Sequence, residues 1–218
     1  MRKLGLLAVT AITFLAAPGA ARAQACLGSV SFASVPVRLG GGMVFGKDYT
    51  AYAASLNAGK DNAAFGAVGV SRVYFDDLDD TGDDIFAEFG YQRPVGTRAQ
   101  LCPVLGVAVG TGPDDAGIEN SRFASAGLAL GLTLRPTSSI KVIPNGSLRF
   151  EYASSDFIDE LGEEQTATDN SGVADLGLGL IFFRDRLAIQ PTVQFPLGAD
   201  NSDVSYGLIV SIGFAVRR

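Results

Sequence analysis

The sequence of 218 residues contains no histidine, no tryptophan and only two cysteines. Histidine is the side chain that most often serves as a general base near neutral pH, so its absence argues against an enzyme, and we assign no catalytic residue. Basic residues are also few: beyond position 23, only 14 lysines and arginines remain against 23 acidic residues. This excess of negative charge argues against nucleic acid as a partner.

A long apolar run is found only at the N-terminus. Arg2 and Lys3 precede the apolar stretch 4–17, and the small-residue site Ala21-Arg22-Ala23 follows it. This pattern predicts a secretory signal peptide over residues 1–23. Beyond it the sequence has no stretch of about 18 apolar residues, so we expect no transmembrane helix in the exported chain.

The exported chain alternates large and small residues with period two, which is typical of β-strands. From Val204 to Val216, large apolar residues at even positions alternate mostly with serine, glycine and alanine, and the stretches 128–134 and 176–182 repeat the pattern. A soluble β-sandwich places its large residues inward and shows polar ones to water. Here the second face is too small to fill a core, so we predict that the large face contacts lipid.

This alternation predicts an all-β fold, namely a closed antiparallel transmembrane β-barrel with meander topology. We expect about ten strands, with eight as the alternative. Residues 24–35 would form a periplasmic N-terminal segment and 36–218 the outer-membrane barrel. The expected strands are at about 36–46, 49–58, 63–74, 84–92, 98–109, 122–134, 139–152, 173–183, 187–196 and 203–216.

Short and long connections alternate between these strands. The short ones, 93–98, 135–139 and 184–186, are rich in arginine. The long ones hold 17 of the 23 acidic residues and comprise 75–84, 110–121, 153–171 and 197–203. Outer-membrane barrels carry short turns at the periplasmic end and longer loops outside, so we expect acidic extracellular loops.

The signal peptide, the ten alternating strands and the loop asymmetry together resemble the small outer-membrane β-barrel proteins of Gram-negative bacteria, the broad group that contains the outer membrane protein A barrel. The resemblance is architectural and covers the whole exported chain. It implies an outer-membrane location, contact with membrane lipid and lipopolysaccharide, and insertion by the barrel insertion machinery. We expect a monomer.

Polar residues on the inward phase define a candidate lumen network. Its members are Glu88, Lys141, Arg149, Glu151, Asp175 and Gln190. They could fill the interior or line a narrow pore, and ten strands is well below the 16–18 that leave a porin channel open. We therefore expect a structural or surface-interaction role. A narrow pore for small solutes or ions is the alternative, and an outer-membrane enzyme is a third possibility.

The stretch DDLDDTGDDIFAE suggests a calcium site. Asp77, Asp79 and Thr81 fall at the first, third and fifth positions of an EF-hand-like loop, with Gly82 and Glu88 at later positions. The alternative is a solvated acidic loop. Calcium at the acidic loops is the candidate metal, and we expect no other cofactor.

The two cysteines, Cys26 and Cys102, would lie in an oxidising compartment, where they could form a disulfide. Cys102 is on the inward phase a few residues from a short turn, and Cys26 follows the predicted cleavage site. A disulfide would pin the N-terminal segment as a partial plug. The alternatives are a lipidated Cys26 with a free Cys102, or two unpaired thiols.

Overall fold

The computed structural model describes residues 26, 28, 32, 35–76, 81–96, 98–112, 118–134, 140–158, 163–198 and 203–214. The predicted signal peptide lies outside these residues. In the described part of the chain, no helix is long and apolar enough to cross a bilayer.

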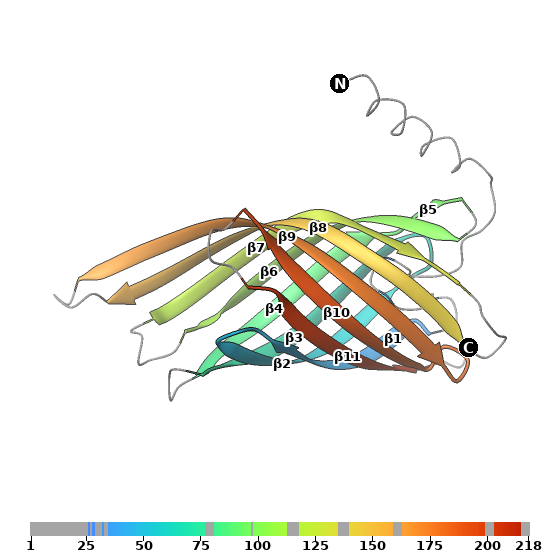
Figure 1. Ribbon diagram of the computed structural model, residues 1–218, viewed down its shortest axis with the longest axis horizontal. Helices are drawn as coiled ribbons and strands as arrows, with labels where there is room; N and C mark the ends of the chain where they lie inside the picture. Colours follow the sequence, from blue (N-terminus) through green and yellow to red (C-terminus); the bar gives the residue numbers. More distant parts are fainter. Residues whose placement is uncertain are drawn as a thin grey trace, which may run out of the picture.

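The described chain forms a barrel of antiparallel strands inclined to its long axis (Figure 1). In chain order the strands are β1 (Val37–Phe45), β2 (Tyr49–Gly59), β3 (Ala64–Phe75), β4 (Thr81–Tyr91), β5 (Arg93–Val95), β6 (Ala99–Thr111), β7 (Ile118–Leu132), β8 (Lys141–Ile158), β9 (Glu164–Phe182), β10 (Leu187–Leu197) and β11 (Ser205–Phe214).

Each strand pairs with its neighbours in the chain, and the first strand pairs with the last. Val37 of β1 lies opposite Phe214 of β11, and this pairing closes the wall. The short strand β5 continues β4 after an interruption at Gln92, because both pair with β6 in one continuous register. The wall therefore has ten strand positions, which confirms the predicted closed meander and excludes the eight-stranded alternative.

The predicted phase of the wall is confirmed. On β7 the leucines at 128, 130 and 132 are exposed on the outside, whereas Gly127, Ala129 and Gly131 face the interior. The same division holds on β6, where Leu105, Val107 and Val109 are exposed. Successive side chains of a strand point to opposite faces of the sheet. Once the orientation of one residue is set, the apolar residues of the whole strand therefore lie on the same outer face.

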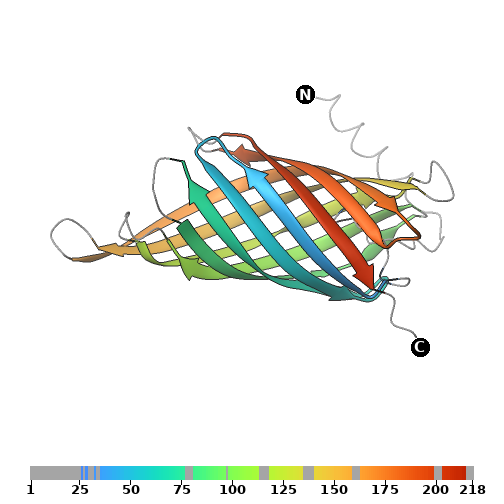
Figure 2. The same ribbon diagram turned by 90° about the horizontal axis from the view of Figure 1, so that it is seen from below.

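The connections at one end of the barrel are shorter than predicted, because strand pairing continues into them. The segment 153–171 was expected to be a loop, but most of it extends β8 and β9, which pair out to Ile158 opposite Glu164. Figure 2 shows this hairpin projecting well beyond the rest of the wall. Similarly, β7 begins at Ile118 and β4 at Thr81, inside the predicted loops 110–121 and 75–84. These extensions carry mostly polar side chains, so they lack the alternation of apolar and polar residues that predicts a strand. The backbone pairs in the same way without it.

Candidate functional site

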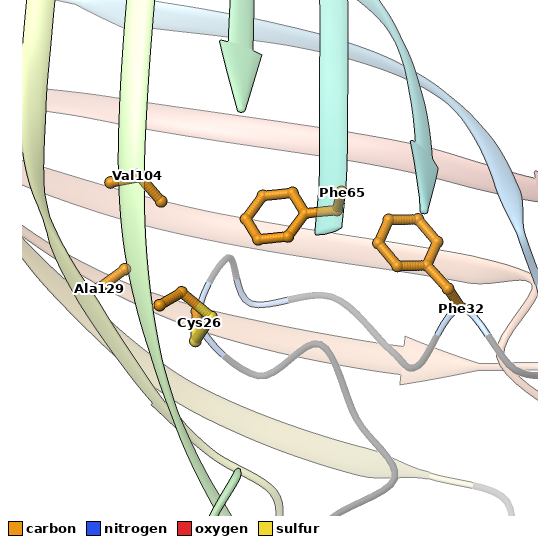
Figure 3. Packing of buried hydrophobic residues seen from close by; sticks show 6 residues of the cluster. Cys26, Phe32, Phe65, Val104 and Ala129 are labelled. Carbon is orange, nitrogen blue, oxygen red and sulfur yellow. A yellow bond between two sulfur atoms is a disulfide. The ribbon is translucent and has the colours of Figure 1, made fainter. Parts of the chain in front are cut away.

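The interior of the barrel is the candidate site, and the N-terminal segment occupies part of it. The structure joins Cys26 to Cys102 of β6 with an S–S distance of 2.10 Å across 76 residues of sequence, the disulfide that the sequence suggested. Both cysteines are buried. Figure 3 shows Cys26 and Phe32 inside the wall, beside Phe65, Val104 and Ala129.

Apolar packing holds the segment in addition to the disulfide. Phe32 is buried, and its ring centroid lies 6.4 Å from that of Phe65 on β3. Val35 is buried against Gly213 of β11, where a Cβ would overlap its side chain. Phe32 covers Gly59 in the same way. Glycines in the wall thus make room for the segment at the end of the barrel where β1 begins.

A charged cluster lines the lumen above this segment. Arg149 of β8 contacts Asp175 of β9 twice, with Nη2–Oδ2 at 3.0 Å and Nε–Oδ2 at 3.1 Å. Its Nη2 also lies 3.5 Å from Oε1 of Glu151. The hydroxyl of Ser147 donates to Asp175 at 2.6 Å. Three of the predicted network residues are therefore brought together.

Glu88 of β4 belongs to the same level of the wall. The register runs from Glu88 to Gly106, Ser125 and Glu151 across four adjacent strands. Glu88 is close enough to Arg149 to interact with it electrostatically. Gly127 leaves room for the Arg149 side chain, since a Cβ there would approach its Cγ to 2.7 Å. One guanidinium thus faces three carboxyl groups, those of Glu88, Glu151 and Asp175.

The remaining two predicted members, Lys141 and Gln190, have partners outside this cluster. The Lys141 ammonium is paired with the Asp185 carboxylate, in the turn between β9 and β10. Arg38 of β1 reaches the same turn, where it donates to the Asp185 carbonyl, and it also donates to Ser211 Oγ on β11. Lys141 begins β8, so it lies at the segment end of the barrel rather than at the level of Arg149.

Gln190 contributes to the seat of the N-terminal segment. Its Nε2 donates to Asn145 Oδ1 at 3.3 Å, and a Cβ on Gly28 would collide with both side chains. Gly28 adopts a left-handed φ of 64°. Gln190 and Asn145 therefore pack against Gly28. Among the described residues, neither side chain forms a hydrogen bond with the Arg149 cluster.

Sequence reasoning missed the apolar residues that face inward at the segment end. Phe65, Val104, Ile143 and Ile181 are buried there, as is Arg38. A signal for Phe65 was present: it is a large residue on the small phase of its strand, out of step with Val68 and Val70. Such a break in phase marks a position where the lumen is filled.

Solvent reaches the lumen beyond the segment. Ile209 faces inward on β11, opposite Gly42 and between the outward Leu208 and Val210. It is nevertheless 40% exposed. The lumen is therefore packed at the end where β1 begins and more open at the level of Ile209.

The predicted calcium site lies largely outside the described residues, which do not include Asp77 and Asp79. Thr81 begins β4 as a strand residue, and nearby Asp83 is bound by Arg72 through two contacts of 2.6 Å. Within the part of the chain that the structure describes, no group of three histidine, cysteine or acidic side chains is arranged to hold a metal ion.

No family model matches the sequence, and no curated protein does. Solved outer-membrane proteins resemble the fold. The translocator domain of autotransporter NalP from Neisseria meningitidis is 14% identical, with a TM-score of 0.52, over 83% of this chain and 86% of that one. The N-terminal β-barrel domain of Pseudomonas aeruginosa OprF is 12% identical (TM-score 0.34), over 82% and 96% of the two chains.

A bacterial polysaccharide outer membrane secretin is 8% identical, with a TM-score of 0.47, over 78% of this chain. This chain spans 57% of the secretin's length. At these identities the likeness is one of fold alone.

Proposed function

We propose that this chain is an integral outer-membrane β-barrel with a structural or surface-interaction role, closed at its periplasmic end by its own N-terminal segment. The observation that carries the proposal is the seat of Cys26, Phe32 and Val35, all buried within the wall. A lumen filled at one end is suited to a rigid scaffold and leaves the projecting strands as the distinctive part of the molecule.

The outer surface supports membrane insertion. Its middle carries exposed aliphatic side chains, including Leu39, Val70, Val107, Leu128 and Leu148. Exposed aromatic residues lie toward the two ends, namely Phe45, Tyr74, Tyr152 and Tyr206 at one and Tyr91, Phe183 and Phe214 at the other. Aromatic girdles flanking an apolar band are the pattern of barrels in lipid.

The two ends support an orientation with the projecting hairpin outside the cell. The hairpin of β8 and β9 and its acidic residues lie at one end. The short turn 183–186 and the N-terminal segment lie at the other. Membrane lipid, lipopolysaccharide and the barrel insertion machinery are the partners that this orientation implies. The closed wall needs no second copy, which supports a monomer.

We assign no catalysis. Asp175, which accepts a hydrogen bond from the Ser147 hydroxyl, is already paired with Arg149, and the sequence holds no histidine that could activate that serine. The charged cluster supports a structural function, because its groups satisfy one another across neighbouring strands.

A narrow pore is the second candidate, and the exposure of the inward-facing Ile209 favours it. Such a pore would open only when the N-terminal segment leaves its seat. Arg149 and the carboxyl groups of Glu88, Glu151 and Asp175 would line it.

Cell fractionation tests the proposal. The protein is expected in the outer membrane, with heat-modifiable migration on gels and with a tag inserted between β8 and β9 accessible on intact cells. Recovery as a soluble periplasmic protein would contradict the membrane assignment. A membrane-bound protein with an inaccessible tag would reverse the orientation.

A further inference from the structure

The strands β7, β8 and β9 form a sheet that projects past the rest of the barrel (Figures 1 and 2). The last pair between β9 and β10 joins Gly172 to Leu197. In contrast, β9 stays paired with β8 from Ser171 opposite Glu151 out to Glu164 opposite Ile158. At about 3.3 Å per residue, this part of β9 extends roughly 26 Å beyond its neighbour on the other side.

The register shows which backbone groups of β9 point toward β10. Pairing between the two strands lapses at Leu178 and Gly179, opposite Pro191 and Gln190. Proline has no N–H, so the lapse places Leu178 and Pro191 at a position where the ladder would exchange hydrogen bonds. By alternation, the even-numbered residues of β9 direct their N–H and C=O groups to the β10 side.

Beyond Gly172 the even-numbered positions of β9 include Thr166, Thr168 and Asn170, and no described strand pairs with them on that side. The Asn170 N–H donates to the Asp169 carboxylate at 2.8 Å instead of to another strand. All three residues are exposed. The segment Thr166–Ser171, which we call the open edge, thus presents backbone donors and acceptors to solvent.

The charge of the projection determines what can pair with this edge. Residues 153–172 contain six acidic residues and no lysine or arginine. Natural proteins commonly protect an edge strand with lysine, proline or a bulge, and the open edge has neither lysine nor proline. Its acidity disfavours pairing with a second copy of itself, because like charges would face one another. The same charge attracts a basic chain.

We propose that the open edge of β9 is a docking site for an extended, lysine- or arginine-rich peptide segment, which adds to the sheet as an antiparallel strand. The incoming strand would take the place that β10 would occupy if it continued past Leu197. Its backbone would bond to Thr166, Thr168 and Asn170, and its basic side chains would draw the Asp169 carboxylate away from the Asn170 N–H. Strand addition to an exposed sheet edge is a general mode of peptide recognition.

The surface role under "Proposed function" would use this site only if the hairpin lies outside the cell, but binding itself can be measured on purified protein in detergent. The probe is a hexapeptide of alternating lysine and valine, and its control carries N-methyl groups on alternate residues. The N-methyl analogue keeps the charge and loses the donors along one edge. We expect it to bind at least about tenfold more weakly, since the ladder bonds are lost.

Matched variants test the same site from the protein side. Thr168→Pro removes a donor from the open edge without removing a bond to β8, and Thr168→Ala removes the side chain but keeps the donor. We expect Thr168→Pro to weaken binding by at least about tenfold and Thr168→Ala to change it by less than about twofold. Unchanged heat-modifiable migration of both variants shows that the barrel is intact.

Three results would overturn the proposal. Equal binding of the peptide and its N-methyl analogue would mean attraction by charge alone. Wild-type affinity in Thr168→Pro would place the site elsewhere. Self-association of the protein that Thr168→Pro abolishes would make a second copy the occupant. None of these results depends on the outer-membrane location, which the fractionation experiment tests separately.

Discussion

Gly28 and Gly179 meet inside the barrel, where a Cβ added to Gly179 would collide with the backbone carbonyl of Gly28. Gly179 belongs to β9, three strands around the wall from the Cys102 disulfide on β6. The N-terminal segment is therefore held to the wall at two separate points, one covalent and one by close packing of backbone against backbone.

This contact predicts that Gly179→Val displaces the segment. The added side chain has no space, so we expect the unfolding free energy to fall by about 1–3 kcal/mol and the lumen to leak. Gly41→Val is the matched control, because a Cβ on Gly41 meets only a carbonyl oxygen at 3.7 Å. Thermal gel-shift midpoints and ion flux into liposomes measure the two effects. Equal behaviour of the two variants would mean that the segment does not rest on Gly179.

The covalent attachment predicts a single cross-linked peptide. Mass spectrometry of the mature protein without reductant should recover Cys26 joined to Cys102. Cys102→Ser should lower the unfolding free energy by about 2–4 kcal/mol, because the cross-link restricts the unfolded chain. A diacylglycerol mass on Cys26 would instead identify a lipid anchor.

Two arginine–aspartate pairs on β7–β9 allow a comparison of inner and outer surfaces. Arg149 faces the lumen with its side chain 24% exposed, whereas Arg122 is 65% exposed and lies 3.2 Å from Asp156. We expect Arg149→Ala to lower the unfolding free energy by about 1–3 kcal/mol, because it leaves partly buried carboxyl groups without their cation. Arg122→Ala should cost about 0–1 kcal/mol. Urea unfolding in detergent or lipid measures both, and equal costs would contradict a lumen role for Arg149.

The outer face makes a prediction about depth. Leu128 lies near the middle of the exposed apolar band on β7. In a bilayer, Leu128→Arg should lower the unfolding free energy by about 2–4 kcal/mol, because it places a cation at the midplane of the membrane. Leu128→Met preserves volume and should cost less than about 1.5 kcal/mol. If both substitutions cost the same in lipid vesicles, Leu128 does not face the membrane core.

Much of the wall could be predicted from the sequence, because the alternation of large and small residues indicates both where a strand lies and which of its faces points outward. The leucines at 128, 130 and 132 indicate both the strand β7 and its apolar outer face. The ends of β8 and β9 could not be predicted in this way. Residues 164–170 are exposed throughout and are polar apart from Ala167, so no contrast between faces distinguishes a strand from a loop.

The lumen was predicted less completely. The phase identifies Arg149, Glu151 and Asp175 as inward residues, but height along the barrel depends on register between strands. Lys141 shares their phase and yet pairs with Asp185 at the end of the barrel. The packing of Phe32 against Phe65 depends on a contact between segments far apart in space until the barrel closes, and no local pattern encodes it.

The conductance of single molecules in a planar bilayer tests the central claim, that the N-terminal segment closes the lumen. The wild-type protein under oxidising conditions should show little or no conductance. The double variant Cys102→Ser/Phe32→Ala, which removes the covalent attachment and the main aromatic contact of the segment, should open discrete channels. Equal conductance of the two proteins, whether both open or both closed, would contradict the claim that this segment blocks the barrel.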